Sequence, residues 1–103
     1  MKNLTPSQEK FTLMVYEYLK PLNVNVHIDF RGNNEMAIEP TNYKGNKLDG
    51  MQILFDANGY EVSEYKAGKN ENELHIYKVT SSWKIALKEM IKGNKRKPIK
   101  IWN

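Results

Sequence analysis

The stretch of sequence that decides the fold is Val24-Asn25-Val26-His27-Ile28-Asp29-Phe30-Arg31, in which apolar and polar side chains alternate without a break. Because successive side chains on a strand point to opposite faces of a sheet, this period of two predicts a strand with one buried face and one face open to water. Antiparallel sheets commonly have this one-sided exposure. We therefore expect an antiparallel sheet whose apolar face is covered by other elements of the same chain.

Turn-forming residues divide the rest of the sheet into further strands. Gly32-Asn33-Asn34 predicts a turn after the first strand, and Pro40 closes the strand that follows. The segment Asp56-Ala57-Asn58-Gly59 predicts a hairpin, because its glycine can take the left-handed position of the turn. The register of this hairpin stays open, since a two-residue loop and a bulged three-residue loop place opposite side chains on the core. The expected strands cover residues 24–31, 36–40, 48–56, 60–66 and 73–80, and residues 99–102 form a short last strand or a docked tail.

Two amphipathic helices flank the predicted strands. Thr5-Pro6-Ser7-Gln8 is typical of a helix start with a capping box, so the first helix is expected over 6–20. The second helix begins at Ser81 or Ser82 and ends at Gly93. The core stripe of the first helix consists of Phe11, Met14, Val15, Tyr18 and Leu19. The core face of the second consists of Trp83, Ala86, Leu87, Met90 and Ile91.

These elements predict one α+β domain. Two amphipathic helices pack on one face of a mostly antiparallel sheet of about five strands, in the order α-β5-α with a short C-terminal strand or tail. Residues 1–94 form the domain, and residues 95–103 are its basic C-terminal tail or edge strand. The length of 103 residues is usual for one domain.

Composition argues against several classes of protein. The chain has no cysteine, which excludes disulfide frameworks and thiolate zinc sites. No apolar run approaches the roughly 20 residues of a membrane span, and the first residues do not resemble a signal peptide, so we expect a cytoplasmic protein with no membrane partner. Common catalytic motifs are absent, so we expect no cofactor and favour a binding protein over an enzyme. The abundance of Lys, Asn and Ile suggests a bacterial or phage origin.

Positive charge gathers towards the C-terminal end of the sequence. The chain has 16 Lys or Arg and 12 Asp or Glu, for a formal net charge of +4. Five of these bases and none of the acids lie within residues 92–103. Clustered cations bind phosphates by releasing counterions, and an aromatic side chain among them can stack on an unpaired base. The predicted nucleic-acid-binding residues are Lys84, Lys88, Lys92, Lys95, Arg96, Lys97, Lys100 and Trp102.

The leading hypothesis is therefore a small non-catalytic binding module that engages DNA or RNA through the second helix and the basic C-terminus. It would position its partner by charge and would not read bases, since we find no recognition helix rich in Asn and Arg. For Trp102 itself, we expect packing on the core in preference to stacking on a base.

A second hypothesis is a protein-binding module, such as an inhibitor, immunity or accessory protein of a phage or mobile element. Leu13 and Tyr16 project from the outer side of the first helix and form a candidate protein interface, including one between two copies of the chain. An open sheet face or edge would serve the same purpose.

A third hypothesis rests on carboxylates. Asp56 and Glu64-Tyr65-Lys66 lie on adjacent predicted strands, and Glu17 lies on the preceding helix. Two carboxylates that hold Mg²⁺ and a lysine that steadies an attacking water serve phosphodiester cleavage. The pattern is similar to that of the PD-(D/E)XK nucleases, and this resemblance implies Mg-dependent nuclease activity, although Phe55 stands where the family often has proline. A structural role competes with this one, since Asp56 can cap the Asn58-Gly59 turn.

Two histidines offer a fourth candidate site. His27 and Asp29 lie on the polar face of the first predicted strand, and His75 lies on the fifth. If the fold brings the three side chains together, they form a candidate metal site or acid–base pair. The ordinary alternative is a surface histidine on a solvated sheet face.

Overall fold

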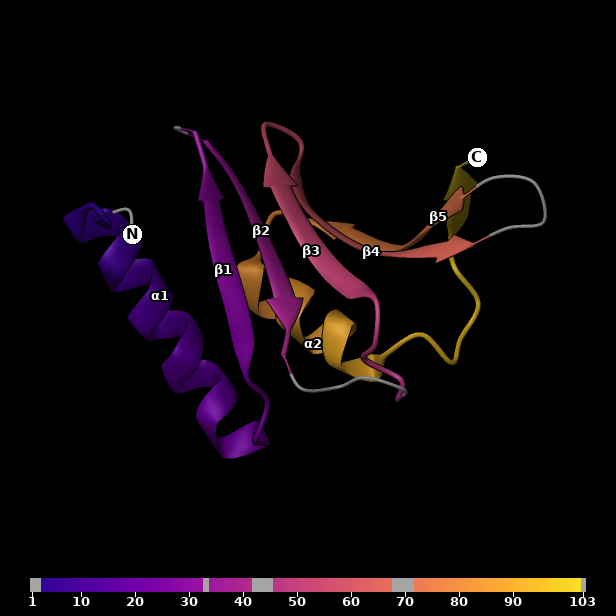
Figure 1. Ribbon diagram of the computed structural model, residues 1–103, viewed down its shortest axis with the longest axis horizontal. Helices are drawn as coiled ribbons and strands as arrows, with labels where there is room; N and C mark the ends of the chain where they lie inside the picture. Colours follow the sequence, from indigo (N-terminus) through magenta and orange to yellow (C-terminus); the bar gives the residue numbers. More distant parts are fainter. Residues whose placement is uncertain (1–2, 33, 42–45, 68–71, 103) are drawn as a thin grey trace.

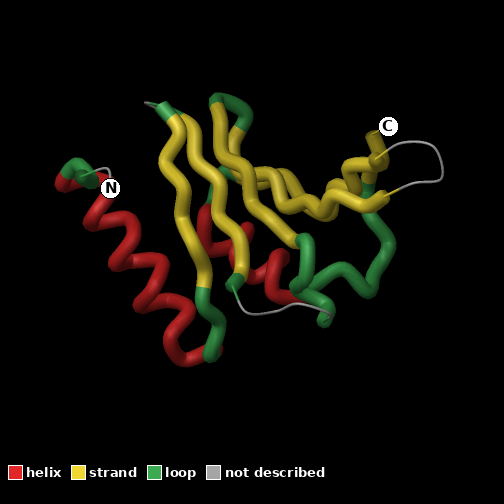
Figure 2. The backbone as a smooth tube through the Cα atoms, viewed as in Figure 1, coloured by secondary structure: helices red, strands yellow, loops and turns green. Residues whose placement is uncertain are grey.

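The computed structural model describes residues 3–32, 34–41, 46–67 and 72–102, which form an antiparallel sheet and two helices (Figure 1). The strands follow one another across the sheet in chain order, and every neighbouring pair is antiparallel (Figure 2). The elements along the chain are α1 (Pro6–Leu19), the 3-10 turn η1 (Lys20–Leu22), β1 (Val26–Arg31), β2 (Glu35–Pro40), β3 (Met51–Asp56), β4 (Gly59–Ala67), β5 (Asn72–Thr80), α2 (Trp83–Lys92) and β6 (Lys100–Trp102).

The predicted sheet of about five strands is wrong, because the sheet has six. After α2 the chain returns to the sheet: the Ile99 amide donates to the Ile76 carbonyl at 2.8 Å, and Trp102 then pairs with Leu74. Nor do the two helices share the sheet evenly. The 10-residue α2 packs on β3, β4 and β5, whereas the 14-residue α1 lies beside β1 at the sheet edge (Figure 1).

The predicted helix caps are confirmed. The Thr5 hydroxyl accepts from the Gln8 amide at 3.2 Å, and the Gln8 side chain accepts from the Thr5 amide at 2.9 Å, which completes the capping box. Ser82 caps α2 by accepting from the Ile85 amide at 3.3 Å, and Gly93 ends it. No helix in the described ranges is long and apolar enough to cross a membrane.

Aromatic side chains join the two helices over the sheet. The Trp83 ring lies edge-on to the rings of Phe11 and Tyr18, each with a centroid distance of 5.8 Å, and Phe11 also contacts Phe30 on β1. Met14, which was expected in this core stripe, is 40% exposed and lines an open hollow with Leu13, Tyr18 and Trp83. The largest fully buried apolar side chains are Leu19, Ile38, Met51, Ile53, Leu87 and Met90.

The pairing of β3 with β4 settles the hairpin register. Asp56 pairs with Gly59, so the loop has two residues, and Gly59 takes a φ of +104°. Phe55 therefore pairs with Tyr60 on the helix-covered face, and Glu61 lies on the opposite, outer face. The expected strand over 48–56 starts only at Met51, because residues 47–50 form a turn.

Candidate nucleic-acid interface

The structure divides the predicted basic cluster, because one carboxylate neutralises part of it. Glu89 on α2 accepts from Lys92 at 2.7 Å and from the Arg96 Nη1 atom at 2.9 Å. Two of the seven predicted cations are therefore paired with an acid of their own chain. Lys84, Lys88, Lys95, Lys97 and Lys100 have no ion-pair partner within the part of the chain that the structure describes.

Arg96 has a structural role. Its Nε atom donates to the Gly93 carbonyl at 3.1 Å, and its Nη2 atom donates to the Glu89 carbonyl at 2.6 Å. The guanidinium also lies 4.9 Å from the centroid of the Tyr77 ring. These contacts satisfy carbonyl groups at the C-terminal end of α2, which have no partner within the helix. Arg96 therefore fixes the chain between α2 and β6 and leaves few donors for a ligand.

A buried carboxylate fixes the same segment from the sheet side. Glu64 is only 5% exposed, and it accepts from the Tyr77 hydroxyl at 3.0 Å and from the Asn94 amide group at 2.8 Å. The Asn94 side chain also donates to the Asp49 carbonyl at 3.0 Å. Burial, together with the hydrogen bond to Glu64, raises the pKa of Tyr77 to about 12. The chain after α2 is thus held on the sheet by a polar network.

Glu89 should make the stability of the fold depend on pH. Hydrogen bonds from Lys92 and then Arg96 lower the pKa of Glu89 below its ordinary 4.5. The folded carboxyl then binds fewer protons than the unfolded one, so its stabilising effect is complete above the unfolded pKa and is lost as the pH falls through the folded pKa. We expect Glu89→Gln to flatten the loss of unfolding free energy between about pH 5 and pH 3, measured by urea unfolding. Parallel curves for wild type and Glu89→Gln would contradict this assignment, and Glu17→Gln on α1 is the control.

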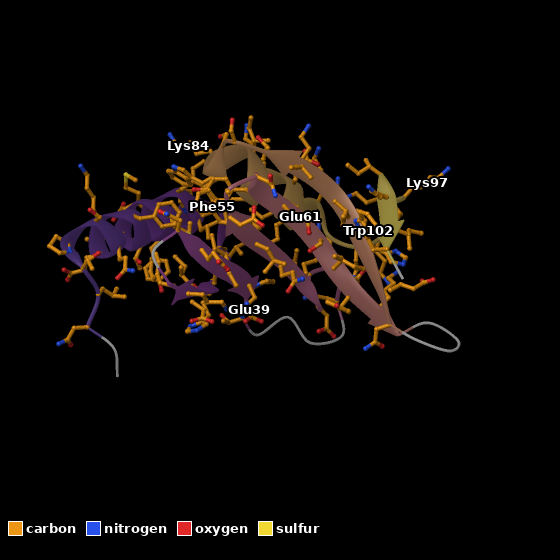
Figure 3. All side chains as sticks on the ribbon, turned by 90° about the horizontal axis from the view of Figure 1, so that it is seen from above. Glu39, Phe55, Glu61, Lys84, Lys97 and Trp102 are labelled. Atoms are coloured by element: carbon orange, nitrogen blue, oxygen red, sulfur yellow. The ribbon has the colours of Figure 1, made fainter. Side chains whose placement is uncertain are left out.

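The unpaired lysines lie at two separate places. Lys84 and Lys88 are exposed on α2, and Lys84 contacts the Trp83 ring. Lys95, Lys97 and Lys100 follow the other end of that helix. Figure 3 shows Lys84 separated along the length of the molecule from Lys97 and Trp102, both of which lie towards the β6 side. The structure therefore does not bring the predicted binding residues into a single patch.

Trp102 is not docked on the core, and that expectation is wrong. Its side chain is 52% exposed, because β6 is the last strand of the sheet and Trp102 extends from its outer face. The Lys100 ammonium lies 4.0 Å from the centroid of its ring. Across the sheet, Trp102 pairs with Leu74, which pairs with Tyr65 on β4. Tyr65 is 62% exposed, so two exposed aromatic rings lie on one sheet face, two strand spacings or about 10 Å apart.

Sequence reasoning missed Tyr65, although a signal was present. Glu64 and Tyr65 are neighbours on a strand and must point to opposite faces. Once the hairpin register places Glu64 opposite the buried Met51, Tyr65 is assigned to the outer face with Trp102. Tyr65, Leu74, Lys100 and Trp102 share this sheet face, and the exposed Lys95 and Lys97 lie on the segment that leads from α2 to β6. We call these six residues together the C-terminal face.

The carboxylates of the nuclease hypothesis lie apart. Asp56 is at the hairpin turn, whereas Glu64 pairs with Met51 five residues further along β4, a distance of roughly 17 Å. Asp56 accepts from the Asn58 amide at 2.8 Å, which is the capping role expected of it. Both oxygens of Glu64 are already bonded within the network described above. The geometry for two-carboxylate Mg²⁺ binding is therefore absent from these residues.

The histidine candidates do not converge either. His27 lies on edge strand β1, and its neighbour Asp29 accepts from Arg31 at 2.8 Å. His75 lies on β5, four strand spacings or about 19 Å away, and contacts Glu73 at 3.1 Å. Within the described ranges, no group of three His, Asp or Glu side chains is placed to hold a metal ion.

The two residues of the predicted interface on α1 lie in different surroundings. Leu13 lines a shallow hollow with Met14 and Trp83, while Tyr16 faces the space between α1 and β1. Both side chains are exposed. They do not line one common hollow.

The C-terminal face is thus the candidate site at which exposed aromatic rings and unpaired cations occur together. Comparison with models of protein families, with curated proteins and with solved structures finds no match to this chain. Function is therefore inferred from the surface of the chain itself.

Proposed function

We propose that the protein is a non-catalytic module that binds single-stranded DNA or RNA on its C-terminal face. The observation that supports this proposal is the exposed Trp102 ring with the Lys100 ammonium beside it and Tyr65 on the same sheet face. Bases offer a free face for stacking on a side chain only when they are unpaired. An aromatic row on a sheet therefore favours a single strand over a duplex.

The charges of the C-terminal face suit the backbone of such a strand. Lys95, Lys97 and Lys100 are exposed and unpaired within the described residues, so each can neutralise a phosphate and release its counterions. Lysine acts as a mobile point charge, whereas base recognition usually uses the fixed fork of arginine. The arginine of this region, Arg96, is engaged by its own helix. Binding is therefore expected to depend on charge and stacking and to tolerate many sequences.

Salt titration of two matched lysine pairs tests the location of the site. Lys95→Ala with Lys97→Ala removes two charges from the C-terminal face, and Lys84→Ala with Lys88→Ala removes two charges from α2. For a single-stranded oligonucleotide, each lost phosphate contact lowers the slope of log affinity against log salt by about 0.7. We expect the first pair to reduce the slope by up to about 1.4 and the second pair to leave it unchanged.

Fluorescence anisotropy with labelled oligo-dT at several salt concentrations measures these slopes. Equal reductions for the two pairs would mean that binding follows net charge alone. Binding by the wild type that does not change with salt, or no binding at all, would refute the proposed function.

A further inference from the structure

The edge strand β1 leaves one set of backbone groups without a partner. The Thr41 amide donates to the Asn25 carbonyl at 2.9 Å, which fixes the hydrogen-bonding phase of the β1–β2 ladder. Antiparallel partners alternate between hydrogen-bonded and non-hydrogen-bonded pairs, so His27, Asp29 and Arg31 point their backbone groups towards β2. The pairing of Val26 with Pro40, which has no amide hydrogen, falls on a non-bonded pair and agrees with this phase.

The intervening residues Val26, Ile28 and Phe30 therefore direct their N–H and C=O groups away from the sheet. Within the described residues, no other group bonds to them. Natural edge strands are commonly protected by proline, by lysine, by a bulge or by being short. β1 has six residues and no proline, lysine or bulge, although Asp29 and Arg31 are charged and α1 lies beside it. Because no described group of α1 bonds to Val26, Ile28 or Phe30, another strand could pair with them in the space between α1 and β1.

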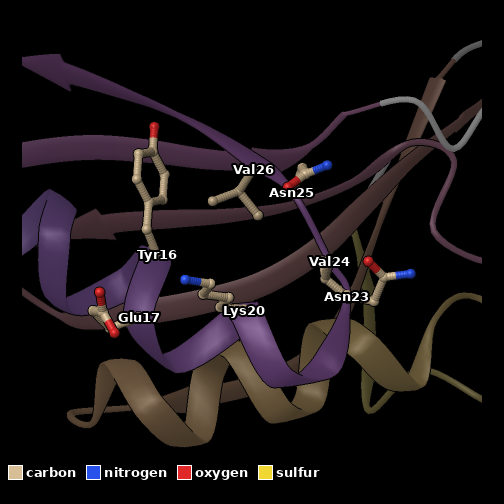
Figure 4. Close-up of a pocket in the computed structure, with 7 residues that line it drawn as sticks. All are labelled: Tyr16, Glu17, Lys20, Asn23, Val24, Asn25 and Val26. Atoms are coloured by element: carbon tan, nitrogen blue, oxygen red, sulfur yellow. The ribbon is translucent and has the colours of Figure 1, made fainter.

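The space beside this edge is hollow along the whole strand. A hollow of about 740 Å³ lies between α1 and residues 27–32, and a second of about 560 Å³ lies between α1 and residues 23–26. Gln8, Thr12 and Tyr16, spaced four apart on α1, line the helix side together with Glu17 of α1 and Lys20 of η1, and Tyr16 borders both hollows. Figure 4 shows Tyr16 of α1 and Lys20 of η1 on the side of the segment that carries Asn25 and Val26.

We propose that an extended segment of another protein, about five residues long, binds in this groove as a seventh strand paired with β1. Its backbone would bond to the free groups of Val26, Ile28 and Phe30. These groups recur at every second residue, a spacing that an extended chain matches. Its side chains would alternate, and those under α1 would meet the Tyr16 ring and be apolar. Those on the outer face would lie beside His27, Asp29 and Arg31 and be polar.

A second copy of the chain fits this edge less well than a peptide. Two copies joined through β1 in antiparallel order are related by a twofold axis perpendicular to the sheet, which keeps both α1 helices on the same face. Each α1 lies beside β1 at the edge, so the two helices would compete for the space over the joint (Figure 1). A peptide strand carries no helix, so it avoids this competition for space.

This groove is separate from the C-terminal face. β1 and β6 are the opposite edges of the six-stranded sheet, so either binding activity can fail while the other is retained. The β6 edge has only three residues and serves as an internal comparison.

Amide hydrogen exchange of the free protein tests the edge directly. We expect the amides of Val26, Ile28 and Phe30 to exchange at least about tenfold faster than those of His27 and Asp29, because only the second set is bonded to β2. Uniform protection along β1 together with a dimeric mass in sedimentation would overturn the peptide proposal in favour of a second copy.

A displayed library of random 12-residue peptides, selected against the full chain, then tests the occupant. Enriched peptides should alternate in polarity, shift the NMR signals of β1 and slow exchange at the three free amides. N-methylation of the peptide amides that face β1 should weaken binding at least about tenfold, while methylation of the intervening amides should not, because only the first set loses a bond and meets a blocking methyl group. Failure to enrich any peptide, equal effects of the two methylation series, or signals confined to β6 would refute the proposal.

Discussion

Replacing Gly93 by alanine is expected to lower the free energy of unfolding by about 3 kcal/mol, as the sum of backbone strain and overpacking, because its φ of +82° and ψ of −168° are essentially confined to glycine. Gly93 has a φ of +82°, and an added Cβ would stand 2.7 Å from the Lys47 Cβ, Cγ and backbone O atoms. The Lys47 carbonyl cannot move away easily, because it accepts a hydrogen bond from the backbone N–H of Asn94 at 2.8 Å. The close approach of α2 to the turn after residue 45 therefore requires glycine.

Gly32 supplies a matched control for this substitution. Its φ of +70° is similar, but an added Cβ would meet nothing within 4 Å. Gly32→Ala should therefore show the strain of a positive φ without any steric contact, about 1 kcal/mol. Urea unfolding of both variants measures the difference in unfolding free energy, provided that the dependence of that free energy on urea concentration is the same for both. Equal losses of unfolding free energy at the two positions would show that the contact with Lys47 is not the reason why position 93 requires glycine.

Local signals in the sequence were sufficient for the type of each element and for the helix caps, but not for every strand end. The capping box at Thr5 and Gln8 involves residues three apart, and the alternation over 24–31 depends only on strand geometry, so neither needs the rest of the fold. The number of strands was not predictable in this way. Whether residues 99–102 pair with β5 depends on the path of the chain after α2. The polar network around Glu64 and Arg96 fixes this path.

The candidate site was predicted only in part for the same reason. Lys95, Arg96 and Lys97 are equivalent in a count of charge, but Arg96 alone reaches the carbonyls of Glu89 and Gly93. A cation that stabilises the fold can be told from one that is free to bind a ligand only when the positions of the acidic side chains and of the helix ends are known. Lys84 was likewise grouped with Lys100 because both are basic, although Lys84 lies at the start of α2 and Lys100 lies on β6.

Trp102→Ala is expected to weaken the binding of oligo-dT by about tenfold, because one stacked base contributes roughly 1–3 kcal/mol. The fold should be unaffected, since the side chain is already half exposed at the sheet edge. Trp102→Phe should retain part of the affinity through its smaller ring. Tyr65→Ala should weaken binding less, and the double variant with Trp102→Ala should lose both contributions if each ring stacks on its own base.

Ile101 is the matched control for this variant. It neighbours Trp102 on β6 and is 50% exposed, but it points to the other face of the sheet. Ile101→Ala removes a similarly exposed apolar side chain without touching the proposed stacking surface, so anisotropy titrations should show unchanged affinity. If Trp102→Ala also leaves the affinity unchanged while the Lys95 and Lys97 pair lowers it, binding occurs through charge alone. The aromatic row would then have no part in nucleic-acid binding, and a duplex should bind as well as a single strand.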